Sequence, residues 1–318
     1  MSKIEWTDKT WNPVTGCTKV SQGCKNCYAE RIYERFNGKG SFRNVICHQD
    51  RIDNPMRWKK PVRVFVNSMS DLFHEDVPFS FIHDVFNTIA ACPQHTFQVL
   101  TKRPRRAIEY LRWFQRGGRY KFTMGKNLWI GVSIEDQETA NERIPLLLQL
   151  PAAVRFLSCE PLLGRVDIAN DAINGQINKM GMNAAMSTGI DWVIAGGESG
   201  PGARPMHPDW VRHLRDQCST ISAAFFFKQW GEWRQYSHLM DDNKKPLGMF
   251  QDGIFRHGNV VWDHRKESVC MSRVGKKEAG RLLDGVLHNE FPRPADKIPS
   301  SDEVAEEDPD FFCGGFDY

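Results

Sequence analysis

The chain has 318 residues, 41% hydrophobic content and a formal net charge of +3, so it can bury one large core or two modest ones. That charge makes no strong case for a polyanionic partner, and no apolar run reaches the roughly 18 residues of a membrane span. The first residues lack the apolar core of a signal peptide, so we expect a cytoplasmic protein. Nine cysteines in that reducing compartment argue against a disulfide framework.

Short apolar runs recur along the chain, and each ends in a polar or glycine-rich tip. They are Val62–Val66, Thr96–Leu100, Leu128–Val132, Val154–Leu157, Trp192–Ala195 and Ala224–Phe227. Helical periodicity fills the gaps at Phe81–Cys92, Ala107–Phe114, Thr139–Leu150 and Pro208–Cys218. Continuous apolar strands alternating with helices are typical of a parallel sheet that is buried on both faces. With one more strand before the first cysteine, the sequence predicts an α/β fold, a full or partial (β/α) barrel of about six to seven units with parallel strands.

Three segments depart from this alternation. Asn170–Gly189 lacks clear periodicity, and we interpret it as a long surface loop or a mobile lid. We assign residues 1–233 to the barrel and residues 234–294 to a small C-terminal appendage, with a hairpin at Gly253–Trp262 and a short basic helix at Gly275–Leu287. Residues 295–318 form an acidic tail that we expect to be flexible.

Cys17, Cys24 and Cys27 form the strongest chemical motif, C-x6-C-x2-C, between the first strand and a helical pattern. Three thiolates can hold an iron–sulfur cluster with one iron left open, or supply three of the four ligands of a structural zinc. The chain has no second C-x2-C and no H-x3-H pair, so zinc would need an isolated fourth ligand, with Cys47 or His48 the nearest. We favour the cluster and keep zinc as the alternative.

Longer motifs accompany the cysteines and extend to about Pro292. They are Trp11-Asn12-Pro13, Gly16-Cys17, Gly23-Cys24, Cys27-Tyr28-Ala29-Glu30, Leu157-Ser158, Glu160–Gly164, Gly196–Gly200, Gly275–Lys277 and Ala279–Arg281. As a set they resemble the phage- and prophage-borne three-cysteine-motif proteins. That family is largely uncharacterised and looks like a divergent branch of the radical S-adenosylmethionine enzymes.

The resemblance implies a 4Fe-4S cluster on the three cysteines, with S-adenosylmethionine on its open iron and an external reductant. In radical S-adenosylmethionine enzymes, electron transfer cleaves the cofactor's C–S bond and gives a 5′-deoxyadenosyl radical. Their usual spacing is C-x3-C-x2-C, with an aromatic residue before the third cysteine. This chain has six residues in the first gap and Tyr28 after the third cysteine, so the adenine contact does not carry over directly. A longer loop between the first two cysteines can still close around a cubic 4Fe-4S cluster.

The polar tips of the strands then become candidates for binding the cofactor. A carboxylate and hydroxyls after the second strand suit the methionyl ammonium, oxygens after the fourth strand, Asp136 among them, could accept hydrogen bonds from ribose, and paired glycines allow close approach to adenine or substrate. The alternative is that these are ordinary turn and capping residues. The candidates are Tyr28, Asn67, Ser68, Ser70, Asp71, Ser133, Glu135, Gly196 and Gly197.

Glu160, Glu198 and Lys228 are candidate catalytic groups. Glu160 directly follows an apolar strand, where a carboxylate is costly unless it binds something. Glu198 could bind a polar handle of the substrate, and Lys228 could pair with a carboxylate or grip an anion. Cys159, beside Glu160, is expected to be a packing residue.

Residues 102–126 contain nine basic and five aromatic residues. Phosphate contacts from Lys102, Arg103, Arg105 and Arg106, with stacking by the aromatic residues, would suit a nucleic acid. The alternative is a helix with aromatic residues toward the core and arginines toward water. The sequence thus predicts a radical S-adenosylmethionine-type enzyme acting on a nucleotide or nucleic acid. The alternative function is a zinc-stapled nucleic-acid-binding protein without catalysis; a barrel metallohydrolase has least support, because no His-x-His set follows the strands.

Overall fold

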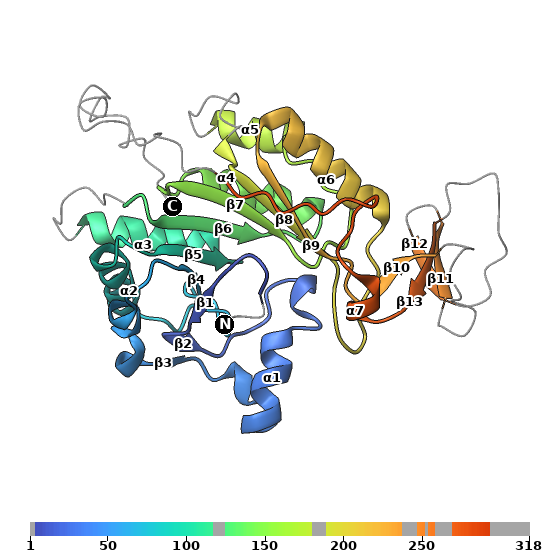
Figure 1. Ribbon diagram of the computed structural model, residues 1–318. Helices are drawn as coiled ribbons and strands as arrows, with labels where there is room; N and C mark the ends of the chain where they lie inside the picture. The colour runs from blue at the N-terminus through green and yellow to red at the C-terminus, as the bar shows by residue number, and fades with distance from the viewer. Residues whose placement is uncertain are drawn as a thin grey trace, which may run out of the picture.

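The computed structural model describes residues 4–116, 125–179, 189–236, 247–251, 254–257 and 269–292. Its main body is a seven-stranded parallel sheet in the order β1-β4-β5-β6-β7-β8-β9 (Figure 1). Each strand lies beside the one before it in the chain, and β1 and β9 form the two edges, so the sheet is a partial barrel. The fold prediction is confirmed. The strands are β1 (Lys9–Trp11), β4 (Arg63–Val66), β5 (Thr96–Thr101), β6 (Leu128–Ser133), β7 (Val154–Cys159), β8 (Trp192–Gly196) and β9 (Ala224–Gln229).

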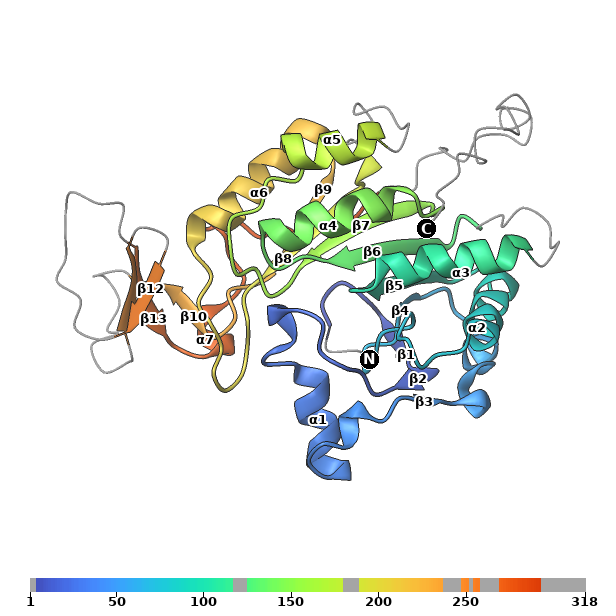
Figure 2. The same ribbon diagram turned by 180° about the vertical axis from the view of Figure 1, so that it is seen from behind.

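Helices connect the successive strands from β4 onward. They are α2 (Phe79–Ala91), α3 (Pro104–Arg116), α4 (Gln137–Leu148), α5 (Asp171–Lys179) and α6 (Pro208–Ile221). Figure 2 shows α3 and α4 in front of the sheet. Asp136, which follows β6, is the N-cap of helix α4. Its carboxylate accepts a hydrogen bond from the Thr139 amide at 2.9 Å. A second small sheet, β2 (Val14–Thr15) with β3 (Ile46–Cys47), and helix α1 (Tyr28–Asn37) lie between β1 and β4 in the chain.

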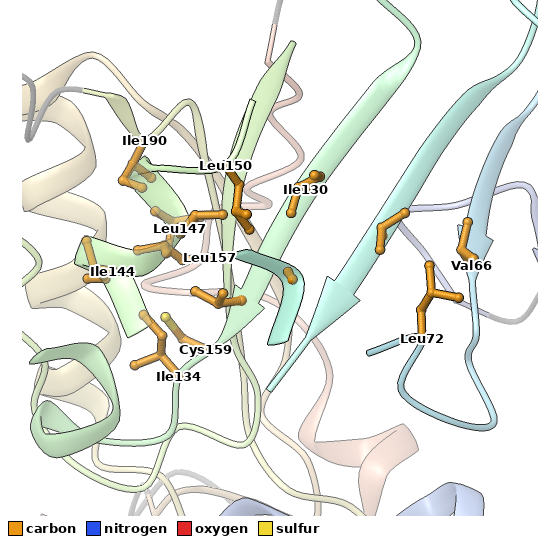
Figure 3. Packing of buried hydrophobic residues seen from close by; sticks show 14 of the residues in the cluster. Val66, Leu72, Ile130, Ile134, Ile144, Leu147, Leu150, Leu157, Cys159 and Ile190 are labelled. Atoms are coloured by element: carbon orange, nitrogen blue, oxygen red, sulfur yellow. The ribbon is translucent and has the colours of Figure 1, made fainter. Parts of the chain in front are cut away.

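The strands are mostly apolar because both faces of the sheet are buried. On the helix-covered face, Leu157 of β7 lies beside Ile144 and Leu147 of α4, and Val66 of β4 lies beside Leu72 at the other end of the same cluster (Figure 3). The opposite face carries a separate, largely aromatic cluster. Its members are Trp6, Phe65, Trp129, Val154, Phe156, Trp192, Ile194 and Phe226. Alternate residues of one strand therefore join different cores, which explains runs without polar positions.

The aromatic cluster also takes in residues far from the strands in sequence. The ring centroid of Trp6 lies 4.7 Å from that of Phe65 and 6.1 Å from that of Trp192. Phe291 covers Trp192 from the other side, with centroids 5.2 Å apart. Gly131 leaves room for this packing, because a Cβ there would come within 2.5 Å of the Phe156 ring. We call this aromatic cluster, on the inner face of the curved sheet, the aromatic floor.

The appendage contains a four-stranded antiparallel sheet in the order β10-β13-β11-β12. Its strands are β10 (Trp233–Gln235), β11 (Leu247–Gln251), β12 (Ile254–His257) and β13 (Val269–Arg273). The hairpin forms between β11 and β12, earlier in the chain than predicted; residues 258–262 and the acidic tail lie outside the described residues. The predicted basic helix shortens to α7 (Lys276–Ala279), because Leu283 and Val286 pair in a bridge soon after it. The division into domains stays a prediction.

One sequence-based interpretation is wrong within the described residues. The first half of Asn170–Gly189 is helix α5, not a loop. The Asn170 side chain accepts a hydrogen bond from the Ile173 amide at 2.9 Å, and Ile173 and Ile177 are buried on one face. This cap and the four-residue spacing of the isoleucines were the available signal. No helix in the described ranges is long and apolar enough to cross a membrane.

Candidate functional site

A cavity of about 270 Å³ lies at the carboxyl ends of the parallel strands, with Trp6 and Phe65 in its wall. The loop of residues 17–27, which we call the cysteine loop, forms one side, and the strand tips form the other. Glu135, Gly196, Arg105 and Arg106 are not part of its lining. The predicted residues that do line it are Cys17, Cys24, Cys27, Tyr28, Asn67, Ser68, Ser70, Asp71, Lys102, Arg103, Ser133, Gly197, Glu160, Glu198 and Lys228.

The cysteine loop takes its shape from its backbone contacts. Gly16 has φ of 89°, and a Cβ there would lie 2.1 Å from the Asn44 carbonyl oxygen, so only glycine fits. The Cys17 amide donates to the Phe42 carbonyl at 2.8 Å, and Cys27 begins α1. All three cysteines are half-buried in the cavity wall. Among the described residues, no group of three Cys, His, Asp or Glu side chains could hold a single metal ion.

The thiols lie in surroundings that disfavour a bare thiolate. Burial, with a contribution from Asp71, raises the pKa of Cys17 to about 11, although the Arg103 guanidinium opposes the shift. Burial also raises the pKa of Cys27. Arg103 Nη1 donates to Cys17 Sγ at 3.6 Å. Thiols with raised pKa values are weak free nucleophiles, and a metal centre that binds such thiols has to deprotonate them.

Glu135 joins the cysteine loop to the sheet at the tip of β6. Its carboxylate is fully buried, forms ion pairs with Lys102 and with Arg143 (Nη1–Oε2 3.1 Å), and accepts a hydrogen bond from Ser21 Oγ at 2.9 Å. A Cβ at Gly23 would lie 2.4 Å from Glu135 Cγ, so the loop rests directly on this side chain. Both oxygens of Glu135 thus have protein partners, and its predicted ribose contact stays a prediction.

Glu198 holds the other half of the loop from the tip of β8. Arg204 binds both of its oxygens, with Nη2–Oε1 at 2.7 Å and Nε–Oε2 at 2.9 Å, and Asn26 donates to it at 2.9 Å. Burial opposes ionisation, but hydrogen bonds from Arg204 and Asn26 hold the pKa of Glu198 below its ordinary value. Arg204 also donates to the Gln22 carbonyl at 3.0 Å. The pair therefore fixes the loop on both sides of Cys24.

The residues that follow β4 contact the end of β5 and the residues after it, close to Cys17. Asp71 accepts hydrogen bonds from Thr101 Oγ1 at 2.8 Å and from the Lys102 amide at 2.9 Å, and pairs with Arg103 at 3.4 Å. Arg103 continues to the Thr18 carbonyl at 3.2 Å. The carboxylate predicted to meet a ligand ammonium is thus engaged by the protein itself.

The segment Asn67–Ser70 contacts β2 and the start of α1. Asn67 Oδ1 accepts from the Val14 amide at 3.2 Å, and Ser70 Oγ donates to the Val14 carbonyl at 2.8 Å. Tyr28 donates its hydroxyl to the Ser68 carbonyl at 2.7 Å. Burial raises the pKa of Tyr28, with smaller contributions from Cys27 and Glu160. These contacts brace the base of the cysteine loop.

Glu160 and Lys228 form a different kind of pair, between the tips of β7 and β9. Lys228 Nζ lies 3.1 Å from Glu160 Oε1 and 3.3 Å from Oε2, and Ser158 Oγ is 3.5 Å away. A Cβ at Gly196 would lie 2.6 Å from Glu160 Oε1, which explains that glycine. Both side chains remain partly exposed, and within the described part of the chain no hydrogen bond joins them to the cysteine loop. This pair therefore lines the cavity without anchoring the cysteine loop.

Residues 1–292 match the family model described as "Protein of unknown function (DUF5131)". The chain belongs to this family. No curated protein matches it. Among solved structures it is similar to spore photoproduct lyase complexed with dinucleoside spore photoproduct, with 13% identity, a TM-score of 0.36, and coverage of 79% of this chain and 67% of that one. A mutant of that lyase with bound AdoMet and dinucleoside spore photoproduct is also similar, with 13% identity and a TM-score of 0.38. The match covers 80% of this chain and 68% of that one. At these scores the likeness defines neither the activity nor the ligand of this DUF5131 member.

In this family member, most of the predicted nucleic-acid contacts already have protein partners. Lys102 and Arg103 point into the site, and Arg106 donates to the carbonyls of His74, Glu75 and Val77 at 3.0–3.2 Å. Arg105 is the exposed one of the four predicted residues. Residues 117–124 lie outside the described ranges, so the rest of that basic stretch stays a prediction.

Trp113 packs against its own protein on one side. Its ring centroid is 5.9 Å from that of Tyr110 and 5.8 Å from that of Phe79, and 37% of the residue is exposed. Among the described residues, the aromatic side chains of helix α3 therefore pack largely against the protein, whereas Arg105, Arg112 and Arg116 are exposed.

Sequence reasoning missed the side chains that anchor the cysteine loop. Arg143 and Arg204 neutralise Glu135 and Glu198, and Asn26 lies inside the cysteine motif itself. A usable signal was present, since each arginine follows its glutamate by fewer than ten residues: Arg143 lies in α4, and Arg204 lies in the loop between β8 and α6.

Proposed function

We propose that this protein is an iron–sulfur enzyme of the radical S-adenosylmethionine type, with Cys17, Cys24 and Cys27 as the cluster ligands. One observation carries the proposal. The three cysteines lie on a single loop that closes over a cavity at the carboxyl ends of a partial barrel's strands. Polar tips of β5, β6 and β8 fix that loop in place, as an enzyme requires of residues that present a reactive group.

The donor set suits a cluster better than a structural zinc. Three thiols without a fourth ligand leave one iron open, whereas structural zinc takes four protein ligands. The two sequence candidates for a fourth ligand do not line the cavity. Cys47 is in β3 opposite Val14, and His48 is hydrogen-bonded to Thr15 at 2.7 Å.

When bound, the cluster would supply the electron that cleaves the sulfonium of S-adenosylmethionine. The chain's own residues support that chemistry in distinct ways. Arg103 donates a hydrogen bond to Cys17 Sγ, and the aromatic floor around Trp6 and Phe65 excludes water from below. Lys228 and Glu160 would bind and orient the polar groups of a ligand, as cation and as hydrogen-bond acceptor.

Anaerobic reconstitution with iron and sulfide tests the proposal. We expect a brown protein with about four irons and four sulfides per chain. Cys24→Ala should lose most of the iron, and Cys47→Ala, a half-buried cysteine outside the cavity, should keep it. A colourless protein with one zinc that is lost in both variants would overturn the proposal and favour the zinc-stapled binding protein.

A further inference from the structure

Helix α1 carries an exposed apolar stripe beside the cavity. Tyr28, Ile32 and Phe36 follow one another at four-residue spacing and are 45%, 46% and 78% exposed. That spacing places all three on one face of the helix. In Figures 1 and 2, α1 projects from the body of the molecule, away from the other helices. Aromatic side chains gathered on an exposed face mark an interaction surface.

The charges on α1 are distributed unequally around the helix. Arg31 and Arg35 flank the stripe, are exposed, and form no ion pair with any residue that the structure describes. The helix's two glutamates lie on the opposite side and are engaged. Glu30 pairs with Lys19 at 2.8 Å, and Glu34 accepts from the Gly40 amide at 2.8 Å.

The segment around α1 is strongly basic, although the whole chain is nearly neutral. Residues 19–43 contain six basic and two acidic residues, a local excess of positive charge that the overall +3 conceals. Lys25, Lys39 and Arg43 are exposed in addition to the two arginines of the helix. A surface of this sign attracts a polyanion.

The stripe leads into the candidate site. Tyr28 belongs both to the exposed face and to the cavity wall, directly after Cys27. Arg31 reaches the loop after β8, where a Cβ at Gly200 would lie 2.0 Å from its Nη1 atom. A ligand lying along α1 therefore has its end at the mouth of the cavity.

We infer that this face of α1 binds a single strand of nucleic acid and directs it to the cavity. Arg31 and Arg35 contact phosphates, and bases stack on the exposed rings of Tyr28 and Phe36, the combination that single-strand-binding surfaces use. The ten residues of α1 extend about 15 Å, the length of roughly four nucleotides. The inference names a substrate class for the proposed enzyme. Any reaction of the bound strand rests on the proposed function, whereas binding of the strand to α1 does not.

A second copy of this chain fits the face less well. A two-fold contact through the stripe would set the Arg31–Arg35 edge of one copy close to the same edge of the other, and like charges repel at short range. A protein partner would use the apolar residues and leave affinity largely independent of salt. Binding of a second copy or of another protein to this face would each give a distinct result in the experiment below.

The experiment measures binding of a fluorescein-labelled, mixed-sequence DNA strand of about twenty nucleotides to the full chain by anisotropy at several salt concentrations. Arg31→Glu with Arg35→Glu should raise the Kd at least about tenfold and lower the salt slope by about 1.4, because two phosphate contacts are lost. Phe36→Ala should raise the Kd about tenfold with an unchanged Tm.

Arg112→Glu with Arg116→Glu, two exposed arginines of α3 with the same four-residue spacing and the same change in net charge, is the matched control and should bind nearly as the parent protein does. Equal losses in both double variants, a loss only in the α3 variant, or no binding by the parent would overturn the inference. So would a change of oligomeric state in Phe36→Ala without any DNA binding, which would indicate a protein occupant.

Iron and sulfide content in the same variants separates this inference from the proposed function. The α1 variants should retain the metal content of the parent protein. Strand binding without a cluster would contradict the proposed enzyme alone, and a cluster without strand binding would contradict this inference alone.

Discussion

Carboxylates at the same edge of one sheet do two different things in this protein. Glu135 and Glu198, at the tips of β6 and β8, are neutralised by arginines from the following elements and hold the cysteine loop. Glu160, at the tip of β7 between them, pairs with a lysine and faces the cavity. Glu135 has three side-chain partners, Arg143, Lys102 and Ser21. Arg204 binds both oxygens of Glu198, and Asn26 is a further donor. Glu160 has one charged partner among the described residues, and a single ammonium on a flexible stem can be displaced by a ligand. We therefore expect a ligand of the cavity to bind at the middle carboxylate.

The largest expected effect comes from breaking the buried anchor. Glu135→Gln removes the ion-pair partner of Lys102 and the nearer of two carboxylates beside Arg143, whose other neighbour, the exposed Glu142, is 4.0 Å away; removing one member of a buried ion pair costs about 3 kcal/mol or more. Urea denaturation gives the free energy of unfolding. Glu142→Gln, at an exposed carboxylate of the same helix, is the control and should change it by less than about 0.5 kcal/mol. A loss below about 1 kcal/mol for Glu135→Gln would show that this carboxylate does not support the loop.

Glu198 should give the next effect, and it depends on pH. Glu198→Gln removes a charged hydrogen-bond pair and should cost about 2 kcal/mol at pH 7. Because the pKa of Glu198 is lowered in the folded protein, its contribution is fully present above the ordinary value of 4.5 and is lost as pH falls through the folded pKa. The gap in unfolding free energy between parent and variant should therefore narrow on acidification below that value. A gap that stays constant down to the folded pKa would refute the assigned ion pair.

Glu160 should give the smallest effect on stability. Glu160→Gln and Lys228→Met each change a partly exposed pair, so we expect losses of about 1 kcal/mol or less. If the proposed function holds, the same variants should lower the affinity of the reconstituted protein for S-adenosylmethionine in isothermal titration calorimetry. If they destabilise the fold as strongly as Glu135→Gln does, the two kinds of carboxylate are not different after all.

The fold was predictable because burial on both faces leaves a plain signature. Phe156 and Leu157 are neighbours in β7 yet belong to separate cores, so neither face of the strand needs polar residues. The cysteine motif was likewise visible. The use of individual charges was not, because an ion pair such as Glu135–Arg143 depends on which way an arginine turns after the chain has folded.

Two further patterns, one in α1 and one that leads into α3, show what sequence reasoning cannot determine. The stripe of Tyr28, Ile32 and Phe36 has the spacing of a buried helix face but is exposed. The basic stretch that begins at Lys102 looks like a phosphate-binding surface, but its first two side chains turn into the site. Spacing reports that a face exists, and only the neighbouring elements determine whether that face is covered.

The aromatic floor has a consequence for the order of synthesis. Trp192 lies between Trp6 and Phe291, and its indole nitrogen donates to the Glu290 carbonyl at 2.9 Å. A nascent chain that has completed all seven sheet strands still lacks the last aromatic ring of this stack, which emerges about sixty residues after β9. The aromatic cluster that contains the cavity-wall residues Trp6 and Phe65 is therefore complete only after residue 291 has been synthesised, and a chain interrupted before that point would carry its three thiols beside an incomplete cluster.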